Sequence, residues 1–126
     1  MGVRGMDHFT VLAADLEATR AFYCDLLGLR VGPRPPFSFP GLWLYAGEQA
    51  VLHVIGGREA PAQAGVIDHV AFRAEGLREL VSALRERSIR YSLNRMPDGG
   101  WQLFCRDPDG ARIELDFDAH EAAPEA

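Results

Sequence analysis

Hydrophobic and polar residues alternate along several short segments of this chain. The period of two covers MDHFTVLA at 6–13, LWLYA at 42–46 and AVLHVIG at 50–56, then IDHVAFRA at 67–74, WQLFC at 101–105 and ARIELDF at 111–117. Such alternation is typical of strands with one buried face. Shorter segments, LRV at 29–31 and IRYSL at 89–93, complete the predicted strands.

Two other segments have the helical period. In residues 16–28 an apolar stripe follows Asp15, a suitable N-cap, and Gly28 provides a stop signal. Residues 77–88 have apolar side chains on one face. The predicted buried positions of the two helices are Leu16, Phe22, Leu26 and Leu27, and Leu77, Leu80, Val81 and Leu84.

The chain contains an internal repeat. A shift of sixty-one residues places Asp7-His8 on Asp68-His69 and residues 50–54 on residues 111–115, with no net insertion. Each half has the element order βαβββ, and the link lies around residues 57–65. We therefore predict a single α+β domain over residues 1–126, with one module at about 6–57 and a second at about 65–118. The polar tail, 119–126, is expected to be flexible, with His120 solvated.

Strand phase divides the polar residues between two faces. In the last strand Ile113, Leu115 and Phe117 alternate with Glu114, so a helix on the apolar side leaves Glu114 on the open face. The same argument applies to the three other strands that carry histidine. It predicts that His8, His53, His69 and Glu114 all point away from the helices.

Three imidazoles and one carboxylate form a plausible ligand set for Zn, Fe(II), Ni, Mn or Co. A single strand histidine is more often a hydrogen-bonded structural residue, and a glutamate beside other acids often belongs to a solvated face. Here both separations, His8 to His53 and His69 to Glu114, are forty-five residues and lie at equivalent places. This joint pattern favours a shared metal site, with Glu114 or His53 able to relay a proton.

Aromatic residues supply candidates for substrate binding. Under the same shift Trp43 and Tyr45 share their phase with Phe104 and Arg106, so these four either line a cavity or belong to the core. The proline-rich loop around 33–40, which contains two phenylalanines, could act as a lid or as a stiff connector. Asp7 and Asp68 are expected to cap or pair locally, because alternation directs them away from the neighbouring histidines.

Composition excludes several classes of function. The net charge is −5 and all thirteen basic residues are Arg, which gives no basic face for nucleic acid. No apolar segment approaches the length of a membrane span, and the N-terminus lacks the apolar core of a signal peptide, so we expect a cytoplasmic protein. Cys24 and Cys105 have no metal-type spacing and are predicted to be reduced, small apolar residues.

With these residues identified, the chain resembles the vicinal oxygen chelate superfamily, which contains glyoxalase I, methylmalonyl-CoA epimerase, extradiol dioxygenases, and fosfomycin- and bleomycin-resistance proteins. The segments that carry the resemblance are DHFTVLAADLEATRAFYCDLLGLRV, from Asp7, and LFCRDPDGARIEL, from Leu103. The resemblance implies two βαβββ modules in tandem that form a curved mixed sheet around a central cavity, with the helices outside.

By the same resemblance His8, His69 and Glu114 stand at the family's His, His and Glu metal ligands. His53 stands where glyoxalase I has Glu and the epimerase Gln. The implied activity is a metal-dependent lyase or isomerase that chelates adjacent oxygens of a small substrate. The alternatives are an Fe(II) ring-cleaving dioxygenase and a drug- or metabolite-binding resistance protein. The resemblance also implies a homodimer that pairs halves across chains.

Overall fold

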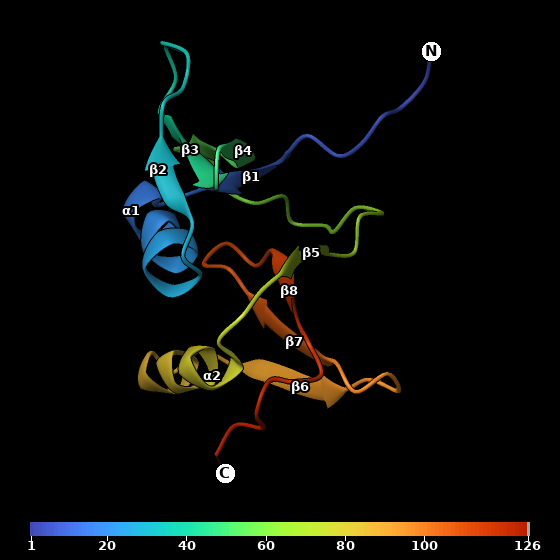
Figure 1. The fold of residues 1–126 in the computed structure, drawn as a ribbon. Helices are drawn as coiled ribbons and strands as arrows, with labels where there is room; N and C mark the ends of the chain where they lie inside the picture. The colour runs from blue at the N-terminus through green and yellow to red at the C-terminus, as the bar shows by residue number, and fades with distance from the viewer. Residues whose placement is uncertain (126) are drawn as a thin grey trace. The chain divides into compact units, whose positions relative to one another are not determined.

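The computed structural model describes residues 1–125, which form two compact units. The first is Met1–Pro61 and the second begins at Ala62, inside the predicted link (Figure 1). Each unit contains a helical segment and one four-stranded mixed sheet, in the order βαβββ. The prediction of two α+β modules is therefore confirmed.

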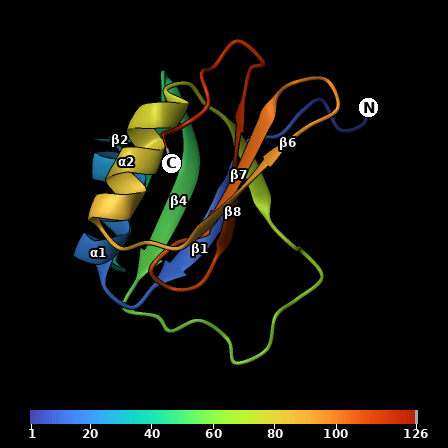
Figure 2. The same cartoon turned by 90° about the horizontal axis from the view of Figure 1, so that it is seen from below.

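The first unit begins with strand β1 (Phe9–Ala13), followed by helix α1 (Leu16–Arg20), which continues as a π-helix, η1 (Ala21–Leu26). Strands β2 (Arg30–Gly32), β3 (Gly41–Ala46) and β4 (Gln49–Gly56) follow. The strand order in the sheet is β1-β4-β3-β2. β1 runs parallel to β4 (both labelled in Figure 2), whereas the β2–β3 and β3–β4 pairs are antiparallel.

The second unit repeats this arrangement. Strand β5 (Val70–Arg73) precedes helix α2 (Leu77–Glu86), and strands β6 (Tyr91–Arg95), β7 (Trp101–Arg106) and β8 (Arg112–Phe117) complete it. The order is β5-β8-β7-β6, and β5 is parallel to β8. No helix among residues 1–125 is both long enough and apolar enough to cross a membrane.

The alternating apolar residues form the core in both units. In β4, Leu52 and Val54 are buried while His53 between them is not, and in β8 Ile113 and Leu115 are almost completely buried. These residues face the same side as the buried positions of the helical segments. The predicted division into a core face and an open face is seen in β4, where His53 is more exposed than its two neighbours. In β8 the Glu114 side chain is itself buried, at 5% exposure, so the open face expected there is covered in this structure.

The π-helix was not predicted from the sequence. The amide of Leu27 donates to the carbonyl oxygen of Phe22 at 3.1 Å, one residue further back than in an α-helix. The wider turn buries Phe22 and the adjacent Tyr23 together, in an edge-to-face contact. The boundaries of the helical segment were predicted correctly, since Asp15 accepts from the Ala18 amide at 3.1 Å and Gly28 has φ +87°.

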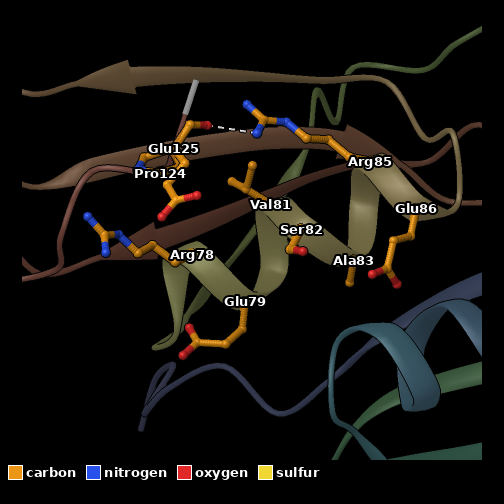
Figure 3. Close-up of a pocket in the computed structure, with 9 residues that line it drawn as sticks. All are labelled: Arg78, Glu79, Val81, Ser82, Ala83, Arg85, Glu86, Pro124 and Glu125. Atoms are coloured by element: carbon orange, nitrogen blue, oxygen red, sulfur yellow. Dashed lines mark hydrogen bonds between the residues drawn. The ribbon is translucent and has the colours of Figure 1, made fainter.

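The C-terminal residues contact helix α2. The Glu121 carboxylate accepts hydrogen bonds from the amides of Gly76 and Leu77 at 3.1 and 3.0 Å, at the helix N-terminus. Arg78 and Arg85 donate to the carbonyl oxygens of Ala123 and Glu125, the latter contact drawn in Figure 3. The groove between α2 and these residues has a volume of about 600 Å³ and contains none of the predicted metal ligands. Flexibility of the tail stays a prediction.

Removal of the Glu121 carboxylate is expected to destabilise the second unit. Gly76 has no side chain with which to cap α2, so Glu121 supplies the acceptor, and the positive end of the helix dipole favours its charge. We expect Glu121→Ala to lower the free energy of unfolding by about 1 kcal/mol in urea denaturation at pH 7. Glu125→Ala, a matched change in the same tail, is the control.

The pH dependence of this effect follows from the direction of the pKa shift. The two backbone amides lower the pKa of Glu121 below its ordinary value of 4.5. A carboxyl with a depressed folded pKa contributes stability above the ordinary pKa and loses it as the pH falls through the folded value. The difference between wild type and Glu121→Ala should therefore shrink below pH 4.5. An unchanged difference at pH 3 would contradict the capping role.

Candidate metal and substrate site

The predicted ligands fall into two pairs, one in each unit. His8 precedes β1 and His53 lies on β4, the parallel neighbour of β1. His69 precedes β5 and Glu114 lies on β8, the parallel neighbour of β5. The repeat therefore brings the two members of each pair together on neighbouring strands of one sheet.

The pair in the second unit has the geometry of two adjacent ligands. His69 Nε2 lies 2.9 Å from Glu114 Oε1, and His69 Nδ1 lies 2.7 Å from Asp68 Oδ2. The hydrogen bond from His69, followed by that from Arg112, lowers the pKa of Asp68. An ionised Asp68 on Nδ1 fixes the orientation of the ring, so that Nε2 faces Glu114.

Glu114 is held on both of its oxygens. Its side chain is 7% exposed, and Gln102 Nε2 donates to Oε2 at 3.2 Å while Oε1 faces His69. Burial, together with the hydrogen bond to Glu114, raises the pKa of Asp116 to about 6. Asp116 Oδ1 is buried without a hydrogen-bond partner among residues 1–125. Glu114 is thus a carboxylate that its neighbours keep in one position.

The pair in the first unit consists of stacked rings. The centroids of His8 and His53 are 3.6 Å apart with 15° between their planes, and Trp43 stacks on His53 at 3.9 Å and 10°. His8 Nδ1 lies 2.7 Å from Asp7 Oδ1. Burial, followed by the charge of His8, lowers the pKa of His53, which favours the neutral imidazole that can bind metal or accept a proton.

The expectation that Asp7 and Asp68 point away from the histidines was wrong. Each carboxylate lies 2.7 Å from Nδ1 of the next residue. The alternation rule fails because His8 and His69 precede strands that begin at Phe9 and Val70. Outside the regular ladder, the backbone no longer directs adjacent side chains to opposite faces.

The four predicted substrate-binding residues have different environments. Trp43 stacks on His53, and Phe104 makes an edge contact with His69 at 5.4 Å, so each lies against one ligand pair. Tyr45 donates its hydroxyl to the carbonyl oxygen of Pro33. Arg106 donates to the carbonyl oxygen of Gly110 at 2.9 Å, in the hairpin that joins β7 and β8. Tyr45 therefore serves a local contact, whereas Phe104 and Arg106 line a cavity of about 430 Å³ in the second unit, as predicted for them.

Two polar residues beside Glu114 were missed by the sequence reasoning. Gln102 and Asp116 are register partners on β7 and β8, and both line a cavity of about 510 Å³ in the second unit, which Arg73 also lines. The period-two rule places Gln102 with Phe104 and Asp116 with Glu114, which is the signal that could have found them. The internal repeat did not point to Gln102 and Asp116, because the shift of sixty-one residues places them on Gly41 and Ile55, which have no polar side chain.

The donors of the second pair are spaced to fit one divalent ion. Two ligands bound at 2.0–2.1 Å and at right angles are separated by about 3 Å, which matches the distance between His69 and Glu114. The first pair differs, because the His8 and His53 rings are nearly parallel. The nitrogen lone pairs lie in the ring planes and therefore do not point to a common position. His53 must rotate relative to His8 before both can bind one ion. Within residues 1–125 no three His, Cys, Asp or Glu side chains are grouped as a metal site.

Comparison with known proteins identifies the family of this chain. Residues 5–115 match the profile of the Glyoxalase/Bleomycin resistance protein/Dioxygenase superfamily. Glyoxylase I 4 of Arabidopsis thaliana is 29% identical over 120 residues, covering 87% of this chain and 68% of the relative. A glyoxalase family protein from Bacillus anthracis is 26% identical with a TM-score of 0.71, over 92% of this chain and 96% of that one.

A binding protein has the same fold. TnmS3, an antibiotic binding protein from Streptomyces sp. CB03234, has a TM-score of 0.69 over 92% of this chain and 97% of its own, at 22% identity. At that identity the likeness concerns the fold alone. Function must therefore be argued from the side chains of this chain.

The contact between Asp7 and His8 predicts the tautomer of His8. With Asp7 as acceptor, neutral His8 should carry its proton on Nδ1, which leaves Nε2 free as a ligand. Long-range ¹⁵N–¹H spectra of the metal-free protein at pH 8.5 should show this tautomer. Asp7→Ala should shift the population toward Nε2–H, while His120, which is exposed, stays unchanged as the internal control. A wild-type His8 protonated on Nε2 would contradict this assignment.

Proposed function

Because the chain belongs to the glyoxalase/bleomycin resistance protein/dioxygenase superfamily, we propose that it is a metal-dependent lyase or isomerase. Its substrate would be a small molecule that presents two adjacent oxygens to a divalent ion. The observation that carries this proposal is the 2.9 Å contact between His69 Nε2 and Glu114 Oε1, with Asp68 on the opposite nitrogen of the ring.

We assign His8, His53, His69 and Glu114 as the ligands of one Zn, Ni, Mn, Co or Fe(II) ion. When bound, such an ion polarises substrate oxygens and stabilises negative charge that develops on them. The second pair is the firmer assignment, since its donors are already spaced for ligation, whereas the first pair requires a ring rotation.

The chain's own residues account for proton transfer in this proposal. Glu114 or His53 would accept the substrate proton, because each is a base within a ligand pair. Gln102 holds Glu114 Oε2, so the other oxygen keeps a constant position. Trp43 and Phe104 lie against the two pairs and would exclude water from bound substrate.

A second candidate is an Fe(II) ring-cleaving dioxygenase. Two imidazoles and one carboxylate are the donors of non-heme iron sites with open positions, and His8 or His53 with His69 and Glu114 supplies them. Capture of a drug or metabolite without chemistry is the third candidate. A pure binding protein has no need for His69 to be held between two carboxylates, which favours the enzymes.

Metal binding tests the ligand assignment directly. We expect purified protein to bind one equivalent of Co(II) or Zn(II) in anaerobic equilibrium dialysis. His69→Ala and Glu114→Ala should each weaken binding at least 100-fold, because each removes a donor and leaves its partner unpaired. His120→Ala, which removes an exposed histidine, should bind as wild type. Wild-type affinity in both His69→Ala and Glu114→Ala would refute the site.

The same samples separate the candidate reactions. Activity with Zn(II), Ni(II) or Mn(II) and no consumption of O₂ would support the lyase or isomerase. Tight Fe(II) binding with catechol-dependent O₂ uptake would support the dioxygenase. Protein that binds no metal but retains a small molecule would support the binding function.

Mixed dimers test how the two pairs combine. We propose a homodimer in which each metal site takes His8 and His53 from one chain and His69 and Glu114 from the other. His8→Ala and His69→Ala chains, each unable to bind metal alone, would be refolded together. The mixed dimer should recover one metal site, because the His69→Ala chain keeps the first pair and the His8→Ala chain keeps the second. If both pairs come from the same chain, no mixed species can regain binding.

A further inference from the structure

A cavity in the second unit is lined by three arginines. Arg90, Arg106 and Arg112 border the cavity of about 430 Å³, and no Asp or Glu is among the described residues that line it. Arg90 and Arg106 are exposed, and the Arg112 side chain is 35% exposed. The chain as a whole has a net charge of −5. A local excess of positive charge in such a chain indicates a place where an anion binds.

Two of these arginines lie opposite each other in the sheet. Arg106 on β7 and Arg112 on β8 are register partners, so both side chains are on the same face of the sheet. Like charges directly opposite each other destabilise an antiparallel pair of strands. An anion bound between the two guanidinium groups would remove this repulsion.

The contacts of Arg106 and Arg112 orient the guanidinium groups but place no carboxylate in the cavity. Arg112 donates to Asp68, whose same oxygen also lies 2.7 Å from His69 Nδ1, so one carboxylate is shared between two groups. Arg106 donates to the uncharged carbonyl oxygen of Gly110 at 2.9 Å. The Arg112 guanidinium is therefore only partly neutralised by its contact, and that of Arg106 is not neutralised by its own.

The remaining lining suits a tetrahedral anion. Ser92 on β6 is the register partner of Phe104, and both line the cavity, so the serine hydroxyl is on the same face as the arginines. The Arg112 guanidinium lies over the Phe104 ring at 4.3 Å, which restricts its plane. Guanidinium groups bind phosphate through paired hydrogen bonds, and a hydroxyl can donate to a further oxygen. A phosphate dianion offers more acceptors and more charge to this set than a carboxylate does.

The cavity adjoins the second ligand pair. Arg112 and Glu114 are two positions apart on β8, so their Cα atoms are about 7 Å apart and their side chains leave the same side of the strand. Phe104 is the register partner of Glu114, contacts His69 at 5.4 Å and lies under Arg112. An anion held by the arginines would therefore lie within the length of one small molecule from His69 and Glu114.

We propose that Arg90, Arg106 and Arg112 form a subsite for the phosphate group of a phosphate monoester substrate. The phosphate would fix one end of the substrate, so that only the other end reaches His69 and Glu114. This orientation rests on the proposed metal function. Binding of the phosphate itself depends only on residues of the second unit, so it can be measured without metal.

The probe is glycerol 3-phosphate, and glycerate is its counterpart with a carboxylate in place of the phosphate. In metal-depleted ¹⁵N-labelled protein at pH 7.5, the Nε–Hε signals of Arg106 and Arg112 should shift on titration with one common affinity. The signal of Arg20, which already donates to Glu17 and Asp25 in the first unit, is the internal reference. We expect glycerol 3-phosphate to bind at least tenfold more tightly than glycerate, because the dianion accepts more charged hydrogen bonds.

Glutamine variants test the arginines separately. Arg90→Gln and Arg106→Gln should each weaken glycerol 3-phosphate binding about tenfold, because each removes a charged donor, while Co(II) affinity stays at the wild-type value. Arg87→Gln removes the same charge at an exposed position of the second unit outside the cavity and is the matched control. Glycerol 3-phosphate should also raise the melting temperature of wild type and Arg87→Gln more than that of the other two variants.

Protein loaded with Co(II) tests the orientation of the substrate. Glycerol 3-phosphate should change the Co(II) absorption spectrum, because its adjacent hydroxyls reach the metal when its phosphate is on the arginines. Methyl phosphate lacks these hydroxyls and should shift the arginine signals without a change in the Co(II) spectrum. Equal spectral changes with both compounds would contradict the orientation.

Several results would overturn the phosphate subsite. These are equal affinity for glycerol 3-phosphate and glycerate, the same arginine shifts with chloride at equal ionic strength, or unchanged binding in both Arg90→Gln and Arg106→Gln. An equal shift of the Arg20 signal would also overturn it, since binding would then be non-specific. Failure of Co(II) binding with intact glycerol 3-phosphate binding would refute the proposed metal function and leave the phosphate subsite standing.

Discussion

The period-two arrangement of side chains in β4 and β8 is the constraint on which the candidate site depends. Leu52 and Val54 must be buried with the helical segment of the first unit, so His53 between them is directed to the opposite face. Ile113 and Leu115 impose the same condition on Glu114. Since β1 and β5 run parallel to these strands, the residues that precede them, His8 and His69, lie beside the same faces.

The two modules share a backbone plan but differ in chemistry. In the second, Gln102 and Asp68 support a histidine–carboxylate pair, which makes a defined half of a metal site. In the first, Trp43 and His53 stack face to face, and the equivalent of Gln102 is Gly41. One module is thus built around hydrogen bonds to a carboxylate and the other around aromatic faces. Our proposals place the better-defined ligand pair and the phosphate subsite in the former.

The contrast also shows why the fold alone does not decide the function. The superfamily profile covers residues 5–115, yet its relatives include glyoxalase-type proteins and an antibiotic binding protein. In this chain His53 is stacked between His8 and Trp43. His53 is thus held by aromatic stacking and not by a polar network, and its proposed role as ligand or base has to be compatible with that stacking.

Alternation and the repeat were enough to predict the strands, the two modules and the strand phase of His53 and Glu114, because both are local properties of the chain. Tertiary structure decided the rest. The contacts of Asp7 and Asp68 with the histidines depend on where each strand begins, which hydrogen bonding to a distant neighbour settles. The partnership of Gln102 with Glu114, and the cap that Glu121 places on α2, join residues 12 and 44 positions apart. Side chains this distant in sequence meet only when the sheet register and chain path bring them together, and no periodicity encodes that meeting.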